Sequence, residues 1–339
     1  MKRIGIVGLG PMGKRHCEAV KMISNAELVA VCDLVEDNVD AIMNEYNVKN
    51  GYRNFDKMLE ANDLDMLIVA TNGPSHAELV INAAKTGIKR ILCEKPMATC
   101  INDAEMMIQA CQTNNVRLTI NHARRWMSPY RKLKRLLDTD IIGDIRHITF
   151  QMAGGQMGSN GGHFWDLVRF LTGDEPKKIM GKLDRSGTPN PRGNQYVDPG
   201  AFGIIIMRNG CRIFFDISED YGVPFFVEIM GTVGRVLIDE KACKWEISAR
   251  KKEDREQPFT RRPSLEAISF EGERLNMILS CKDAIVELMG KGNKISCTGH
   301  DGLKSLEMTV AVHKSEEARN QFVSFPLTDS DKAKNFMFT

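Results

Sequence analysis

A glycine-rich segment near the start of the sequence carries the clearest chemical signal. It reads Gly-Leu-Gly-Pro-Met-Gly from Gly8 to Gly13 and directly follows Arg3–Val7, an apolar run typical of a buried strand. This spacing permits a tight turn at Gly8, a close approach of pyrophosphate to the backbone at Gly10, and close packing of a helix on the strand at Gly13. The amino terminus of that helix would face the phosphates. The pattern predicts a dinucleotide-binding turn rather than an ordinary strand-to-helix turn.

An acidic residue follows at the distance that such a site requires. Asp33 lies twenty residues beyond Gly13, at the end of the second predicted strand. A carboxylate at this position accepts hydrogen bonds from the adenosine ribose hydroxyls and repels the 2'-phosphate of NADP. The next residues, Leu34, Val35 and Glu36, include no lysine or arginine that would neutralise that phosphate. The sequence therefore predicts NAD as the cofactor, with NADP disfavoured.

The elements around these residues indicate an α/β chain with two domains. In the first ~120 residues, short apolar runs alternate with longer amphipathic segments, which is typical of a doubly wound parallel (Rossmann) sheet with helices on both faces. The predicted strands there are 3–7, 27–32, 66–70, 90–93 and 117–121, and the predicted helices are 12–22, 36–46, 75–86 and 102–114. After a helix at 129–138, the closely spaced runs 145–151, 201–207, 212–217 and 225–230 favour a mostly antiparallel sheet, and helical patterns follow at 274–288 and 302–321. We place a Rossmann domain at residues 1–122 and an α+β domain at residues 123–339.

Composition argues for a small-molecule partner. The 46 basic and 44 acidic residues leave a formal net charge of +2, which predicts neither a nucleic-acid partner nor a membrane partner. The nine cysteines contain no CxxC pair, and the first residues do not form a signal peptide, so we expect reduced thiols in the cytoplasm. The seven histidines are scattered, and we expect no metal site.

Three further motifs point to one family. Glu94-Lys95-Pro96 and Ala70-Thr71-Asn72 follow predicted strands, and Gly161-Gly162-His163 is followed by Asp166. With the glycine-rich turn, these motifs resemble the glucose-fructose oxidoreductase and inositol dehydrogenase (Gfo/Idh/MocA) family. Asn121 with Arg124 and Arg125, and Asp301-Gly302-Leu303, extend the resemblance over nearly the whole chain.

The resemblance implies an NAD-dependent enzyme. Similar proteins pass a hydride between the nicotinamide and a secondary alcohol or ketone of a sugar, polyol or nucleotide-linked sugar. It also implies a large open sheet in the second domain that mediates a homodimer or homotetramer. The residues expected to bind the cofactor are Gly8, Gly10, Pro11, Met12, Gly13, Asp33, Thr71, Asn72, His76, Glu94, Lys95 and Pro96.

Two residues are expected to carry the chemistry. An alcohol that loses a hydride must also lose its hydroxyl proton, and His163 is the expected base because imidazole titrates near neutral pH. Lys95, taken from the family motif, would bind the reacting oxygen and stabilise its negative charge. The full set expected to contact substrate is Lys95, His122, Arg124, Arg125, Ser159, Asn160, His163, Asp166 and Tyr221.

One position departs from the family pattern. Similar proteins place an aspartate four residues before the histidine, whereas this chain has Ser159. Serine holds no negative charge that would stabilise imidazolium, so another residue, Asn160 or Asp166, would have to orient the histidine. Two alternatives to net alcohol oxidation stay open: an enzyme that recycles tightly bound NAD during elimination or epimerisation, and a non-catalytic sensor of NAD or sugar.

Overall fold

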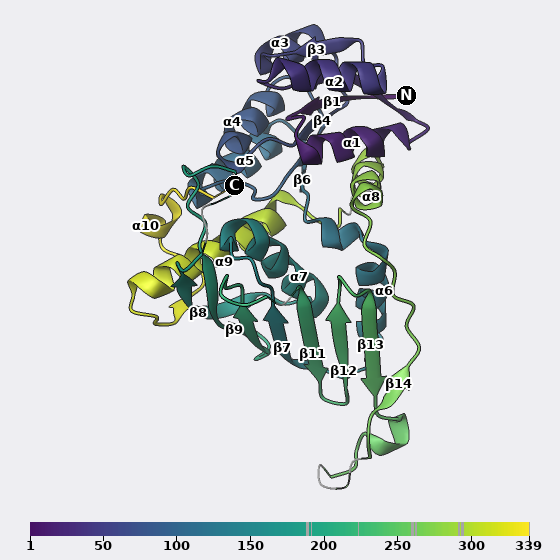
Figure 1. Cartoon of the computed structure of the whole chain (residues 1–339), viewed down its shortest axis with the longest axis vertical. Coiled ribbons are helices and arrows are strands. Elements are labelled where there is room, and N and C mark those ends of the chain that lie inside the picture. The colour runs from purple at the N-terminus through teal and green to yellow at the C-terminus, as the bar shows by residue number, and fades with distance from the viewer. Residues whose placement is uncertain are drawn as a thin grey trace. The chain divides into compact units, whose positions relative to one another are not determined.

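The computed structural model describes residues 1–187, 190, 192–222, 224–258, 261, 263–290, 292 and 295–338. The chain forms two compact units, and each contains one β-sheet (Figure 1). The first unit comprises Met1–Met127, Asn276–Leu306 and Asp329–Thr339, and the second comprises Ser128–Leu275 and Glu307–Thr328. This division differs from the contiguous one expected at residue 122, because two later segments belong to the first unit.

The first unit contains the predicted parallel sheet. Its strands pair in the order β3-β2-β1-β4-β5-β6, and all five pairs are parallel. The strand order reverses between β1 and β4, and ligands of open α/β sheets bind beside such a reversal, at the carboxyl ends of the strands. The strands are β1 (Lys2–Val7), β2 (Ala26–Cys32), β3 (Asn50–Tyr52), β4 (Met66–Val69), β5 (Arg90–Cys93) and β6 (Arg117–Ile120). The helices are α1 (Pro11–Lys21), α2 (Glu36–Tyr46), α3 (Phe55–Ala61), α4 (Gly73–Ala84), α5 (Ile101–Thr113) and the 3₁₀ turn η1 (Ala123–Trp126).

A segment distant in sequence completes this unit. It contains α8 (Met277–Met289) and the first part of α9 (Gly299–Glu317), which continues into the second unit. Arg117 donates hydrogen bonds to the carbonyl oxygens of Gly290 (2.7 Å) and Gly292 (2.9 Å), which lie just after the end of α8. A Cβ on Gly302 would lie 2.5 Å from Cγ1 of Ile120, so α9 approaches β6 as closely as a glycine allows. The predicted helices at 274–288 and 302–321 therefore exist, but the first of them belongs to the Rossmann unit.

The last described residues also pack on the first unit. α10 (Asp329–Lys332) precedes Phe336, whose N–H donates to the carbonyl oxygen of Thr99 at 3.0 Å. Phe336 and Phe338 are buried and stacked, with ring centroids 5.4 Å apart. Burial of each ring contributes about 2 kcal/mol of hydrophobic stabilisation.

The second unit is built on a nine-stranded sheet of order β14-β13-β12-β11-β7-β10-β9-β8-β15. Every pair is antiparallel except β7 with β10, which confirms the mostly antiparallel sheet that the sequence predicts. The strands are β7 (Ile145–Gln151), β8 (Pro176–Asp184), β9 (Gly200–Met207), β10 (Arg212–Asp216), β11 (Phe226–Gly231), β12 (Gly234–Asp239), β13 (Lys244–Ala249), β14 (Glu266–Ile268) and β15 (Val323–Ser324). The helical elements are α6 (Ser128–Leu137), the π-helical turn η2 (Met157–Gly161), α7 (Gly162–Thr172) and the 3₁₀ turn η3 (Lys252–Asp254).

Aromatic side chains fix α7 on one face of this sheet. Phe164 stacks on Phe150 with ring centroids 3.6 Å apart, and Trp165 meets Phe215 edge to face at 4.9 Å. The indole N–H of Trp165 donates to the hydroxyl of Thr309 on α9 at 3.0 Å. Since these two aromatic residues directly follow His163, the start of α7 has a fixed position within the unit.

Among the described residues, no helix has both the length and the apolar character that a membrane span requires.

Candidate functional site

The glycine-rich turn joins β1 to α1 as expected. Gly8 has a positive φ of 88°, and a Cβ there would lie 2.6 Å from the carbonyl carbon of Ala70. A Cβ on Gly13 would lie 2.0 Å from the carbonyl oxygen of Gly8. The protein's own packing thus demands the first and third glycines, whereas a Cβ on Gly10 would meet nothing within 4 Å among the described atoms. This open space at the start of α1 fits the close approach of a pyrophosphate, and Pro11 begins a helix with no acidic residue in its first turn.

Asp33 orients the same turn. Its Oδ2 accepts the N–H of Leu9 at 2.7 Å, and its Oδ1 accepts the N–H of Val35 at 2.9 Å. A carboxylate has about four lone-pair sites, so both oxygens keep capacity for ribose hydroxyls. The side chain therefore links the phosphate end of the predicted cofactor site to its ribose end.

Glu94, the first residue of the Glu94-Lys95-Pro96 motif, forms a buried ion pair with His16. Glu94 follows β5, and its Oε1 lies 2.8 Å from Nε2 of His16 on α1 and accepts the amide N–H of Asn121 at 2.6 Å. His16 is 0 % exposed and Glu94 is 6 % exposed. Burial alone would raise the pKa of Glu94, but the hydrogen bond and charge of His16 hold it below its usual value. Burial likewise opposes a charged ring at His16, but the nearby Cys281 sulfur and the Glu94 carboxylate outweigh it and raise the pKa of His16 to about 10.

Lys95 stands beside this anion. It is half-buried between buried Glu94 and buried Pro96, and its charge helps to keep the pKa of Glu94 low. Lys95 thus directly follows a buried and hydrogen-bonded carboxylate, which suits a group that must hold a reacting oxygen.

His76 ties the motif to the neighbouring turn. Its Nδ1 lies 2.8 Å from the carbonyl oxygen of Pro96, and its Nε2 lies 3.0 Å from that of Thr71. Burial holds the pKa of His76 below its usual value, so the neutral ring donates to one of these two carbonyls at a time. Asn72 and Thr71 precede α4, and the hydroxyls of Thr71 and Ser75 are 2.7 Å apart. The structure thus brings the expected cofactor residues of the β4–α4 and β5–α5 turns together.

Two residues expected to contact substrate form hydrogen bonds to other residues of the chain. Arg125 is 8 % exposed and donates to the carbonyl oxygen of Ser296 and, at 3.0 Å, to Asp301, so it anchors the later segment of the first unit. The hydroxyl of Tyr221, in the second unit, donates to the carbonyl oxygen of Asp216 at 2.7 Å and accepts the N–H of Met152 at 3.1 Å. Burial raises the pKa of Tyr221 to about 12, so it stays protonated. His122 is buried and Arg124 is half-buried in the first unit.

In the second unit, His163 lies in the first turn of α7. Asn160, in the π-helical turn η2 before it, donates from Nδ2 to the carbonyl oxygen of Gly155 at 3.0 Å. Ser159 and Asp166 are buried, and Asp166 lies 3.8 Å from Nη1 of Arg169. Lys95 belongs to the first unit and His163 to the second.

Sequence reasoning missed two buried charged groups. His16 lies three residues after Gly13 on α1, so its spacing from the glycine motif was a usable signal. Asp198 accepts the backbone N–H groups of Gly158 and Ser159, 39 to 40 residues earlier in the chain, and no local pattern marks it.

The ion pair makes the stability of the first unit depend on pH. Replacing His16 with glutamine removes the hydrogen-bonded cation of the buried Glu94 carboxylate, and we expect a loss of about 3–5 kcal/mol in the free energy of unfolding. Because the pKa of Glu94 is lowered, its contribution is complete above the ordinary carboxyl pKa and is lost as pH falls through the folded value. Because the pKa of His16 is raised, its contribution is complete below about pH 6.5 and is lost as pH rises through about 10. Urea denaturation of both proteins from pH 5 to pH 10 measures the difference.

The difference between wild type and His16→Gln should be largest near pH 5–6.5 and should shrink toward pH 10. His300→Gln, at an exposed histidine of the same unit, is the control and should change stability little at any pH. A His16→Gln penalty that is constant over this range would contradict the ion pair.

Comparisons with known proteins agree with this geometry. Residues 2–122 match the model of an "Oxidoreductase family, NAD-binding Rossmann fold", and residues 134–324 match the "C-terminal alpha/beta domain" of the same family, Gfo/Idh/MocA. The chain is 27 % identical to myo-inositol 2-dehydrogenase of Thermotoga maritima over 70 % of this chain and 75 % of that protein. It is 32 % identical to D-apiose dehydrogenase of Paraburkholderia graminis, over 50 % of this chain and 49 % of that protein.

The fold is also that of solved structures. Scyllo-inositol dehydrogenase of Lactobacillus casei, solved with NAD(H) and scyllo-inositol bound, superimposes with a TM-score of 0.76 at 22 % identity, over 96 % of this chain and 99 % of that one. The two family models together leave only the segment between them and the ends of the chain unmatched. The chain therefore belongs to the Gfo/Idh/MocA oxidoreductase family, and its first unit contains that family's NAD-binding Rossmann fold.

Proposed function

We propose that this protein oxidises a secondary alcohol of a sugar or polyol with NAD, or catalyses the reverse reduction. The observation that carries the proposal is the cluster in the first unit that fastens Lys95 to the glycine-rich helix through the contact between Glu94 and His16. Relatives named for myo-inositol and D-apiose support the substrate class. A nucleotide-linked sugar belongs to the same class of secondary alcohols.

The proposed cofactor contacts follow from the geometry of the turn. The N–H groups at the start of α1 would bind the pyrophosphate, Asp33 the adenosine ribose, and the Thr71-Asn72 turn the nicotinamide end. Leu34 is 82 % exposed directly after Asp33 and offers an apolar surface to the adenine ring. Bound NAD supplies the acceptor for the hydride.

The proposed proton chemistry depends on His163. As the carbinol C–H bond breaks and its electron pair leaves with the hydrogen, the hydroxyl O–H bond also breaks, and its proton goes to the imidazole of His163. For Lys95 we propose a separate role, the stabilisation of the negative charge that develops on the alcohol oxygen. In the reduction, His163 returns the proton to the oxygen. A base positioned in this way contributes roughly 10²–10⁴-fold to the rate.

Replacing Lys95 with alanine tests the assignment. We expect kcat for alcohol oxidation to fall by roughly 10²–10³-fold, because the oxygen loses its electrostatic stabilisation, while NAD affinity stays within a few-fold. NADH absorbance with a panel of inositols, sugars and sugar acids measures turnover, and calorimetry measures NAD binding. Lys85→Ala, at an exposed lysine after α4, is the matched control. Turnover by Lys95→Ala at the wild-type rate would remove Lys95 from the mechanism.

Replacing Asp33 tests the choice of cofactor. Asp33→Asn keeps an oxygen that accepts the N–H of Leu9 or Val35 but removes the charge that repels a 2'-phosphate. We expect the ratio of kcat/KM for NAD to that for NADP to fall at least about tenfold, since hydrogen bonds to charged groups contribute roughly 1.5–3 kcal/mol. Asp33→Ala also removes the acceptor and should in addition weaken NAD binding. An unchanged ratio in both variants would show that Asp33 only shapes the turn.

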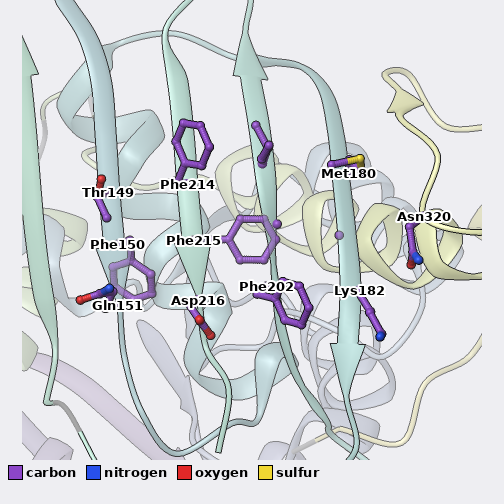
Figure 2. Close-up of a pocket in the computed structure, with 13 residues that line it drawn as sticks. Thr149, Phe150, Gln151, Met180, Lys182, Phe202, Phe214, Phe215, Asp216 and Asn320 are labelled. Carbon is purple, nitrogen blue, oxygen red and sulfur yellow. The ribbon is translucent and has the colours of Figure 1, made fainter. Parts of the chain in front are cut away.

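The open face of the large sheet supports a further proposal, that the protein is a homodimer or homotetramer. Phe202 is 44 % exposed and Phe214 is 41 % exposed, and they line a cavity of about 490 Å³ on β7–β10. Figure 2 shows both rings with Lys182 and Asp216 on the strands. An apolar surface of this kind, rimmed by polar groups, is typical of a contact between copies.

Charge on this face should separate the copies. We expect Phe202→Glu/Phe214→Glu to sediment as a smaller species than wild type in analytical ultracentrifugation, because assembly would bury two carboxylates without partners. Met106→Glu, at an exposed residue of α5, should sediment like wild type. Equal sedimentation of all three proteins would exclude this face as the interface.

A cytoplasmic location completes the proposal. All nine cysteines lie within the described residues and are free thiols, and eight of them are buried, which is typical of a protein in a reducing compartment.

A further inference from the structure

The turn before His163 is held by a buried carboxylate from a distant segment. Asp198, between β8 and β9, is 7 % exposed. Its Oδ1 accepts the N–H of Gly158 at 2.6 Å, and its Oδ2 accepts the N–H of Ser159 at 2.9 Å. The carbonyl oxygen of Pro199, the next residue, accepts the N–H of Met157 at 2.9 Å. Three consecutive N–H groups of η2 therefore bind two adjacent residues of the β8–β9 connection.

This contact places a negative charge close to the start of α7. Residue 159 precedes His163 by four positions, which is about one helical turn. An aspartate at 159 would carry its charge on that turn, and this chain has a serine there. Asp198 binds the backbone of the same serine, so its carboxylate lies beside the same turn although it comes from another part of the chain.

We propose that Asp198 supplies the negative charge that residue 159 lacks, and thereby acts as a positioning residue for proton transfer at His163. The inference rests on the proposed function, in which His163 is the base. An anion fixed near an imidazole stabilises its protonated form and so favours the ring as the acceptor of the hydroxyl proton.

Asp166 and Glu219 are two other carboxylates near this turn. On α7, Asp166 lies 3.8 Å from Nη1 of Arg169, and Arg169 also donates two hydrogen bonds to Glu175, at 2.8 and 2.6 Å. These charges largely compensate one another. Glu219 lies against Gly155, before η2 begins, whereas Asp198 contacts the turn itself.

If Asp198 only stabilises the turn, its replacement changes stability but not proton transfer at His163. A carboxylate that accepts N–H groups at a helix start contributes about 1–2 kcal/mol to stability whether or not its charge is felt at His163. Asp184 is the matched control, because it also accepts two backbone N–H groups in this unit, from Ser186 (3.0 Å) and Glu219 (2.8 Å). Both Asp198→Asn and Asp184→Asn should lower stability, but only Asp198→Asn should change proton transfer.

The test is the pH profile of kcat for alcohol oxidation. The base must be neutral to accept a proton, so kcat rises with pH through the titration of His163. Removing the anion lowers the proton affinity of the ring, and we expect Asp198→Asn to move the acidic limb by about one unit toward lower pH, a tenfold change in proton affinity. The double variant Ser159→Asp/Asp198→Asn should move the limb back, and Asp184→Asn should not move it. An acidic limb that stays in place in Asp198→Asn would overturn the inference.

Two measurements separate the failure of this inference from the failure of the proposed function. If His163→Ala oxidises the alcohol at the wild-type rate, the base assignment itself is wrong. If His163→Ala is inactive and Asp198→Asn leaves the limb unmoved, only the role of Asp198 is wrong. Should Asp198→Asn not fold, an NMR titration of His163 in the wild-type protein decides: a midpoint above about 6.5 supports the inference, and a midpoint at or below it overturns the inference.

Discussion

The buried carboxylate of Glu94 links several elements of the first unit. A charge removed from water needs partners from several directions, and here they come from His16 on α1 and Asn121 after β6. Since α1 also carries the glycine-rich turn, and Glu94 directly precedes Lys95, one interaction sets both the cofactor turn and the proposed catalytic ammonium. Asn121 also approaches the sulfur of Cys281 at 3.9 Å, which brings α8 into the same cluster.

Much of the first unit could be predicted from sequence because its signals are local. Four-residue strands such as β4 and β5 are almost wholly buried, and the glycine-rich turn and Asp33 lie within one βαβ unit. β3 and α3 were missed because three and seven residues are too short to show a period. In the second unit the predicted strands exist, and the predicted antiparallel sheet is confirmed, but its edge strands and their order depend on pairings that periodicity does not encode.

The site was less predictable than the fold, and distance along the chain is the reason. Arg125 donates hydrogen bonds to Ser296 and Asp301, which lie 171 and 176 residues away in sequence. No residue close to Arg125 in the sequence indicates these partners. Asp198 follows Ser159 by 39 residues and lies in another connection: Ser159 lies between β7 and β8, and Asp198 lies between β8 and β9. Motifs identified the side chains that could do chemistry, whereas only the folded chain shows which of them are already engaged by other parts of the protein.

The return of the last described residues to the first unit has a consequence for synthesis. The Rossmann sheet is made early, with β6 ending at Ile120, yet Phe336 and Phe338 are part of the packing of that unit. At roughly 5–20 residues per second, the ribosome needs on the order of tens of seconds to pass from Ile120 to Phe336. Until then the nascent first unit carries an uncovered apolar surface, while the second unit is made and folds. A chaperone that binds during translation at the place where Phe338 will later lie would shield this surface.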